Sequence, residues 1–173
     1  MSRRATEPCR AQAMTALTLA ACRTRAIMHG VAHRRTELKA FAERWMSLWA
    51  GDNLRLADEI HDPRFVDRSP SGRGCDLAAF KSGISNLYAA FPDFCAAIER
   101  LVIDEDTATV AIRWTATGHH CAAFMGRPAT NARVHFAGIE IIRIEDGKVI
   151  ERWGEWDSLA IAEQIDGQAA LQR

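Results

Sequence analysis

The feature that most constrains the fold is a change of hydrophobic period near residue 95. Before it, apolar residues recur at steps of three and four, which is typical of amphipathic helices. The first such set is Leu38, Phe41, Trp45, Leu48 and Trp49. After it, apolar and polar residues alternate, as expected for half-buried strands. Helices followed by a run of strands predict an α+β domain.

Turn and breaker residues divide these patterns into elements. Helices are predicted from Thr36 to about residue 50, over 54–60 and over 77–91, with a last short one starting near Ser158. Strands are predicted over 65–67, 97–103, 107–117, 134–144 and 148–155, the last two joined by a Glu-Asp-Gly turn. A sheet of this kind needs one face covered. We therefore expect it to curl around the helices and enclose an apolar, cone-shaped pocket.

Composition narrows the classes of function. The chain has 173 residues, enough for one domain with a real core. Lys plus Arg equals Asp plus Glu at 22 each, so no net charge attracts nucleic acid, and no stretch has the ~20 apolar residues of a membrane-spanning helix. Five cysteines without paired spacing indicate reduced thiols and a cytoplasmic location. The zinc motifs C-x-x-C and H-E-x-x-H are absent, and we expect neither a metal nor another cofactor.

The first thirty residues differ from the rest, being rich in Arg, Ala and Thr with a single acid. We interpret residues 1–30 as a disordered or mis-annotated extension, with Met28 as the functional start. Two alternatives stay open: a lipoprotein box that would anchor the chain at Cys22, and a transit peptide. The predicted organisation is this extension, a domain over 34–167 and a tail over 168–173.

Four motifs carry a resemblance to a known family. They are AFPDF (90–94), FMGRPAT (124–130), IEDGKVIERW (144–153) and WDSLAIAEQIDG (156–167). In this order they resemble the SnoaL-like polyketide cyclase branch of the nuclear transport factor 2-like superfamily. The resemblance implies a curved sheet wrapped around helices, a pocket open at one end, a homodimer and no cofactor. It also implies a small apolar or polyketide-like substrate, closed into a ring by intramolecular aldol condensation.

Asp157 matches the acid that these cyclases use as general acid and base. An apolar pocket raises the pKa of a carboxyl towards the value needed to remove a proton from carbon between carbonyls. Aspartate is also a favoured N-cap, and a helix is predicted to begin at Ser158. Strand alternation places Trp153 and Glu155 on the same face as Asp157. We predict that this face lines the pocket.

Further candidates come from departures and aromatic residues. Arg68 stands where many family members have a histidine, and its guanidinium would clamp a carboxylate or enolate oxygen unless it is an exposed surface residue. His119 is a candidate second proton-handling group or a surface-loop histidine. Trp114 and Trp45 are candidate substrate-binding aromatics.

Two functions are predicted from these residues. The first is an enzyme that uses Asp157 as general acid and base on a carbonyl-activated substrate. The alternative is a non-catalytic module of the same fold that binds a small molecule or dimerises, because a fold does not fix a function.

Overall fold

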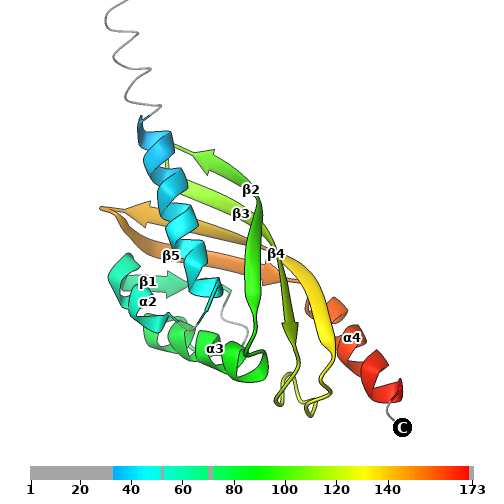
Figure 1. The fold of residues 1–173 in the computed structure, drawn as a ribbon. Helices are drawn as coiled ribbons and strands as arrows, with labels where there is room; N and C mark the ends of the chain where they lie inside the picture. Colours follow the sequence, from blue (N-terminus) through cyan, green and yellow to red (C-terminus); the bar gives the residue numbers. More distant parts are fainter. Residues whose placement is uncertain (1–32, 52, 70–71, 172–173) are drawn as a thin grey trace, which may run out of the picture. The chain divides into compact units, whose positions relative to one another are not determined.

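A computed structural model describes residues 33–51, 53–69 and 72–171 (Figure 1). Contacts divide the chain into two compact units, Met1–Glu37 and Leu38–Arg173. The second unit carries all the elements discussed below. The predicted extension over residues 1–30, including the alternative anchor at Cys22, lies outside the described residues.

Helices stand at both ends of the second unit. Residues 38–46 are helical and continue into the 3-10 turn η1 (Ser47–Trp49), which is followed by α2 (Leu54–Ile60) and α3 (Leu77–Ala90). Asp76 caps α3 by accepting a hydrogen bond from the amide of Ala79 at 2.8 Å. The last helix, α4, spans Ser158–Leu171 and so includes residues 168–171, which were expected to be a tail. No helix in the described part of the chain is long and apolar enough to cross a membrane.

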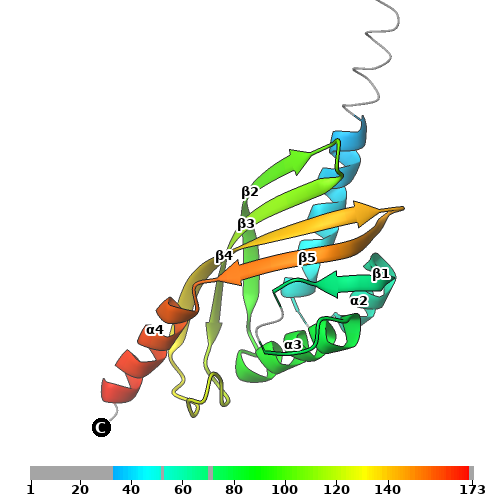
Figure 2. The same cartoon turned by 180° about the vertical axis from the view of Figure 1, so that it is seen from behind.

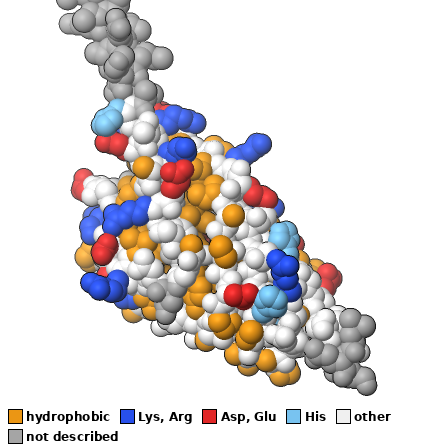
Figure 3. Space-filling view, viewed as in Figure 1, with side chains coloured by type: hydrophobic (Ala, Val, Ile, Leu, Met, Phe, Trp, Pro, Cys, Tyr) orange, Lys and Arg blue, Asp and Glu red, His pale blue; other side chains and the backbone are white. Residues whose placement is uncertain are grey.

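Five strands form a single sheet. They are β1 (His61–Asp67), β2 (Cys95–Asp104), β3 (Thr109–His119), β4 (Arg133–Glu145) and β5 (Lys148–Trp156). Their order is β1-β5-β4-β3-β2, with β1 parallel to β5 and every other pair antiparallel. Figures 1 and 2 show the helix of residues 38–46 crossing one face of this sheet, with α3 near the C-terminal end of that helix. Figure 3 shows hydrophobic side chains that reach the surface on this side of the molecule. The predicted α+β fold is confirmed.

The core lies between the helices and this inner face of the sheet. The predicted alternation of β3 is confirmed, because Val110, Ile112, Trp114 and Ala116 are all buried. Aromatic side chains contact each other edge to face in the core, Trp49 with Phe80 and Phe94, and Trp114 with Phe136. A polar side chain on this buried face must find a partner within the protein.

A one-residue irregularity in the β4–β5 hairpin decides which side chains of β5 face the helices. Next to the turn Ile144 pairs with Val149, but after one step the register shifts and Arg143 pairs with Glu151. Ile150 is the extra residue, and it is buried like its neighbour Val149. A bulge of this kind reverses the alternation of all residues beyond it.

The bulge explains why the predicted inner face of β5 is wrong. The residues that face inward are Arg152, Gly154 and Trp156, which pair with the inward positions of β4. Trp153 and Glu155 are exposed and face outward. Simple alternation from the turn would have paired Glu151 with Ile142, and it would have turned Trp153 and Glu155 inward, as the sequence analysis assumed.

Candidate functional site

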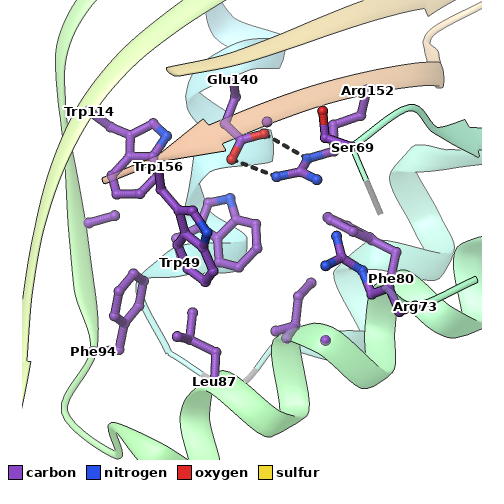
Figure 4. Close-up of a pocket in the computed structure, with 14 residues that line it drawn as sticks. Trp49, Ser69, Arg73, Phe80, Leu87, Phe94, Trp114, Glu140, Arg152 and Trp156 are labelled. Carbon is purple, nitrogen blue, oxygen red and sulfur yellow. Dashed lines mark hydrogen bonds and ion pairs between the residues drawn. The ribbon is translucent and has the colours of Figure 1, made fainter. Parts of the chain in front are cut away.

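A pocket lies between the inner face of the sheet and the helices, and its wall is largely aromatic (Figure 4). It contains about 560 Å³ of empty space, counting the part open to solvent. Its lining residues are Trp49, Ser69, Arg73, Phe80, Gly83, Ile84, Leu87, Phe94, Ala96, Trp114, Glu140, Arg152, Gly154 and Trp156.

The charged side chains of the lining are Arg73, Glu140 and Arg152, and together with Asp67 they form a chain of four. Arg152 donates from Nε and Nη2 to the two carboxylate oxygens of Glu140, at 2.6 and 2.8 Å. Its Nη1 donates to Oδ1 of Asp67 at 3.0 Å, and Arg73 donates from Nη2 to Oδ2 of Asp67 at 2.5 Å. Asp67 thereby joins two arginines, one on β5 and one in the loop before α3.

These charges are held almost without solvent. Glu140 is 3% exposed and Arg152 is 6% exposed. Burial raises the pKa of Glu140 above its ordinary value, although the charge and hydrogen bonds of Arg152 oppose the shift. Burial also disfavours the charge on Arg152, but Glu140 and Asp67 raise the pKa of its guanidinium. Charges this deep contribute to stability only while their partners remain in place.

Two glycines give the pocket side chains room to lie across the sheet. A Cβ at Gly154 would overlap the guanidinium of Arg152 and a carboxylate oxygen of Glu140. A Cβ at Gly138 would overlap the indole of Trp114. Each glycine therefore acts through its missing side chain, which allows the Arg–Glu pair and the tryptophan to lie close to the backbone.

The pocket wall also contains buried donors that have no partner. Among the described residues, the unpartnered buried side-chain atoms of the lining are Nε1 of Trp49, Nε1 of Trp114 and Nε of Arg73. All three are N–H groups, which can only donate. The residues of the wall therefore hold three hydrogen-bond donors for which the described residues supply no acceptor.

Asp157 lies at the junction of β5 and α4 and does not line the pocket. Its side chain is exposed, and Oδ1 accepts a hydrogen bond from the amide of Ala160 at 2.9 Å. This is the N-cap contact that the alternative interpretation predicted. Its catalytic role stays a prediction that the fold does not test.

Other predicted site residues of this region lie on the outer face. Arg68 donates to Oε1 of Glu151 at 2.5 Å and does not reach the pocket, since it follows inward-facing Asp67 on the strand. Trp153 is 36% exposed, and Glu155 accepts a hydrogen bond from the hydroxyl of Ser69 at 3.0 Å. The prediction that Trp153 and Glu155 face the pocket is corrected by the bulge described above.

The remaining predicted residues have different surroundings. His119 is exposed, and its Nδ1 lies 2.6 Å from Oδ2 of Asp93, away from the pocket. Trp114 lines the pocket. Trp45 is fully buried one layer behind it, where it packs on Trp49 and donates to Nε2 of His61 at 3.2 Å.

The sequence analysis missed Glu140, Asp67, Arg73 and Arg152. For Glu140 a signal was present, because Val134, Phe136, Ile142 and Ile144 fix the inward parity of β4 and Glu140 shares it. The arginines gave no comparable signal, since an inward guanidinium interrupts the apolar alternation that marks an inner face.

Metal ligation does not account for the charged cluster. Within the described ranges, no group of three or more His, Cys, Asp or Glu side chains is placed to hold a metal ion. The carboxylates at the pocket have arginines as partners instead.

The fold and the pocket define a class of α+β proteins with a cavity between one sheet and its helices. Comparison with known proteins identifies the family. The model of the SnoaL-like polyketide cyclase family matches residues 39–165, most of the described chain. The chain therefore belongs to the SnoaL-like polyketide cyclase family. No functionally curated protein matches it in sequence.

Solved structures of similar fold come from several bacteria. AclR of Streptomyces galilaeus, provisionally a hydroxylase, is 26% identical with a TM-score of 0.68, over 76% of this chain and 82% of that one. A provisional polyketide cyclase of Bacillus cereus is also 26% identical, with a TM-score of 0.65 over 76% and 81%. TsrD of Streptomyces laurentii is 22% identical, with a TM-score of 0.68 over 76% and 96%, and shows the fold alone.

Proposed function

We propose that the protein is a cofactor-independent enzyme of the cyclase type in which Glu140, rather than Asp157, transfers the proton. The observation that carries this proposal is a carboxylate buried in the wall of a largely aromatic pocket, with its pKa raised by burial. A general base for carbon acids works best when its pKa lies near the pH of operation, and burial shifts a carboxyl in that direction.

The reaction begins with a ligand whose acidic carbon lies against Glu140. A carboxylate oxygen takes the proton from a carbon next to a carbonyl, and the electron pair of the C–H bond moves into the enolate. The enolate carbon then attacks a second carbonyl of the same molecule, and Glu140 returns the proton to the new alkoxide. Arg152 keeps both carboxylate oxygens in place, while each still has a lone pair to accept the proton.

The first half of this reaction can be tested without knowing the natural substrate. The α-protons of 2-tetralone, a flat bicyclic ketone, exchange with deuterium from solvent when a base removes them. NMR should show that the wild-type protein accelerates this exchange above the buffer rate. Glu140→Gln should lower the acceleration by about 100-fold, the size typical of a lost general base.

Asp157→Asn is the matched control. The amide of asparagine keeps the cap on α4, so the fold is retained while the carboxylate is lost. The proposal expects exchange at close to the wild-type rate. Loss of exchange in Asp157→Asn, with Glu140→Gln unaffected, would return the proton transfer to the residue that the sequence analysis preferred.

The second candidate function is binding without catalysis. It is favoured by the two hydrogen bonds from Arg152, which occupy both oxygens of the only carboxylate that lines the pocket in the described part of the chain. A protein of this kind would bind 2-tetralone and leave its exchange rate at the value of the buffer. Calorimetry together with NMR separates the two functions.

The outer face of the sheet fits the homodimer that the family implies. Ile139 is 46% exposed there and Trp153 is 36% exposed. Ile141, two residues after Ile139 on β4, pairs with Trp153 on β5. A second copy would cover this apolar strip. Light scattering should give twice the chain mass, and Ile139→Lys should yield monomers with the pocket unchanged.

The exposed thiols of Cys75, Cys95 and Cys121 fit the proposed cytoplasmic location.

A further inference from the structure

The polar groups of the pocket wall indicate which hydrogen-bonding groups a ligand would need. Trp114 is 4% exposed, yet its indole N–H has no partner among the described residues. The N–H of Trp49 and the Nε–H of Arg73 are in the same state. A buried donor without an acceptor destabilises the empty pocket, and an acceptor atom of a ligand would remove that cost.

These donors are spread across the pocket. Figure 4 shows Trp114 and Arg73 on opposite sides, with Trp49 and Trp156 between them. A ligand that meets donors on both sides therefore needs two separate acceptors and a body that lies among aromatic rings. Flat conjugated molecules fit such surroundings, because ring faces and edges attract each other.

The two ends differ in charge. Trp114 offers a neutral N–H, which suits a ketone oxygen. Arg73 offers a cation whose Nη2 contacts Asp67 and whose Nε–H has no partner among the described residues. An arginine N–H of this kind pairs best with a carboxylate, through a short charge-assisted hydrogen bond.

We propose that the pocket binds a flat, conjugated keto acid, with its carboxylate against Arg73 and its ketone oxygen on the indole N–H of Trp114. The inference rests on the proposed function only in the choice of pocket. It specifies a free acid rather than an ester, and it holds for an enzyme or a binding protein. Binding is therefore the measurement, and turnover is not required.

Three probes separate the two contacts. The first, 9-fluorenone-2-carboxylate, has both acceptors; its methyl ester lacks the anion, and fluorene-2-carboxylate lacks the ketone. Isothermal titration calorimetry with the full chain should show the keto acid binding at least about tenfold more tightly than the ester, as expected for a hydrogen bond to a charged group.

Two variants assign the contacts to residues. Arg73→Met should abolish the preference for acid over ester, and Arg73→Lys, which keeps the charge, should retain part of it. Trp114→Phe keeps a ring and removes the N–H. It should weaken the keto acid by about fivefold and leave fluorene-2-carboxylate unchanged.

Several results would overturn the inference. They are an ester that binds as tightly as the acid, a preference that survives in Arg73→Met, equal losses for both acids in Trp114→Phe, and no detectable binding of the keto acid. None of them bears on the exchange assay, so the proposed function can stand or fail by itself. Circular dichroism and urea unfolding of each variant show whether a loss reflects the contact or the fold.

Discussion

On β5, Glu151 and Arg152 are neighbours in sequence, but they lie in opposite environments. Glu151 faces outward and shares two arginines, Arg68 and Arg143, at the edge of solvent. Arg152 faces inward and is held by Glu140 and by a second carboxylate with almost no solvent. The same residue types therefore form a solvated network on one face and the polar wall of a pocket on the other.

The comparison shows that burial, rather than the number of ion pairs, decides how much these charges matter for stability. An exposed pair gains little, because water and salt screen it. A buried pair contributes only while it is complete, since a single unpaired charge in the core is costly. At the edge of the inner network, Nε of Arg73 is buried without a partner. Donors on the outer face can bond to water instead.

The largest expected effect comes from breaking the inner network. Arg152→Met leaves Glu140 and Asp67 without their shared cation and should lower the free energy of unfolding by about 3–5 kcal/mol. Arg143→Met, the matched change on the outer face, should cost less than about 1 kcal/mol. Urea unfolding followed by circular dichroism measures both. Equal losses would refute the distinction, and adding Glu140→Leu to Arg152→Met should restore part of the stability.

A buried group with neutral partners should give the next largest effect. Burial lowers the pKa of His61 from 6.5 to about 4, although the hydrogen bond to the carbonyl of Ala57 opposes the shift. The unfolded chain then binds more protons than the native one between these values. The contribution of neutral His61 to the free energy of unfolding should be fully present above pH 6.5. It should fall by up to about 3 kcal/mol as the pH drops towards 4.

The ion pairs of Glu151 on the outer face should lose their contribution to the free energy of unfolding in a different pH range. Arg68 and Arg143 lower the pKa of Glu151 through hydrogen bonds, so its contribution is present above its ordinary value of 4.5 and lost only below it. The pKa values of Glu140 and His120 are also shifted, so the contribution of His61 is the difference between the wild type and His61→Gln in urea unfolding at pH 7.5, 6 and 5. The variant should lose less stability towards low pH, and a profile parallel to that of the wild type would contradict the assignment.

A single methyl group should disturb the inner network less. In Gly154→Ala the new Cβ meets the guanidinium of Arg152 and the carboxylate of Glu140, and overpacking of this kind costs about 1–3 kcal/mol. Gly167→Ala is the control, because no atom lies within 4 Å of its added methyl and alanine favours the helix. Thermal unfolding should show Gly154→Ala less stable and Gly167→Ala unchanged or more stable.

The smallest effect concerns the exposed end of β5. Asp157→Ala removes the cap from α4 and should cost about 1 kcal/mol, while Asp157→Asn should be close to wild type. Thermal unfolding in parallel with the exchange assay measures both properties. A loss in Asp157→Asn as large as in Asp157→Ala would show that charge, rather than capping, matters at this position.

The elements could be read from the sequence because their signals are local. The change of period separated helices from strands, Pro63 and Pro92 follow the ends of two helices, and Asp76 caps the third. The need to cover one face of the sheet predicted the pocket, and the resemblance to the family implied it as well. These features depend on a few neighbouring residues, so a tertiary structure was not needed to find them.

The composition of the site depended on a feature that local patterns do not reveal. The extra residue Ile150 in the β4–β5 hairpin reverses every later side chain of β5. Without it, Trp153 and Glu155 would face the helices as predicted, because an apolar residue alternating with polar ones marks an inner face. With it, Arg152 and Gly154 do, and the polar wall of the pocket is built from residues that looked like surface.

The sequence by itself determined the fold class, the order of the elements, the family and the cap on α4, since each rests on short-range spacing or on ordered motifs. Only the tertiary structure decided which charges meet. Asp67, Arg152 and Glu140 come from three strands and are up to 85 positions apart, and their contact depends on strand register, which one inserted residue shifts for the whole strand.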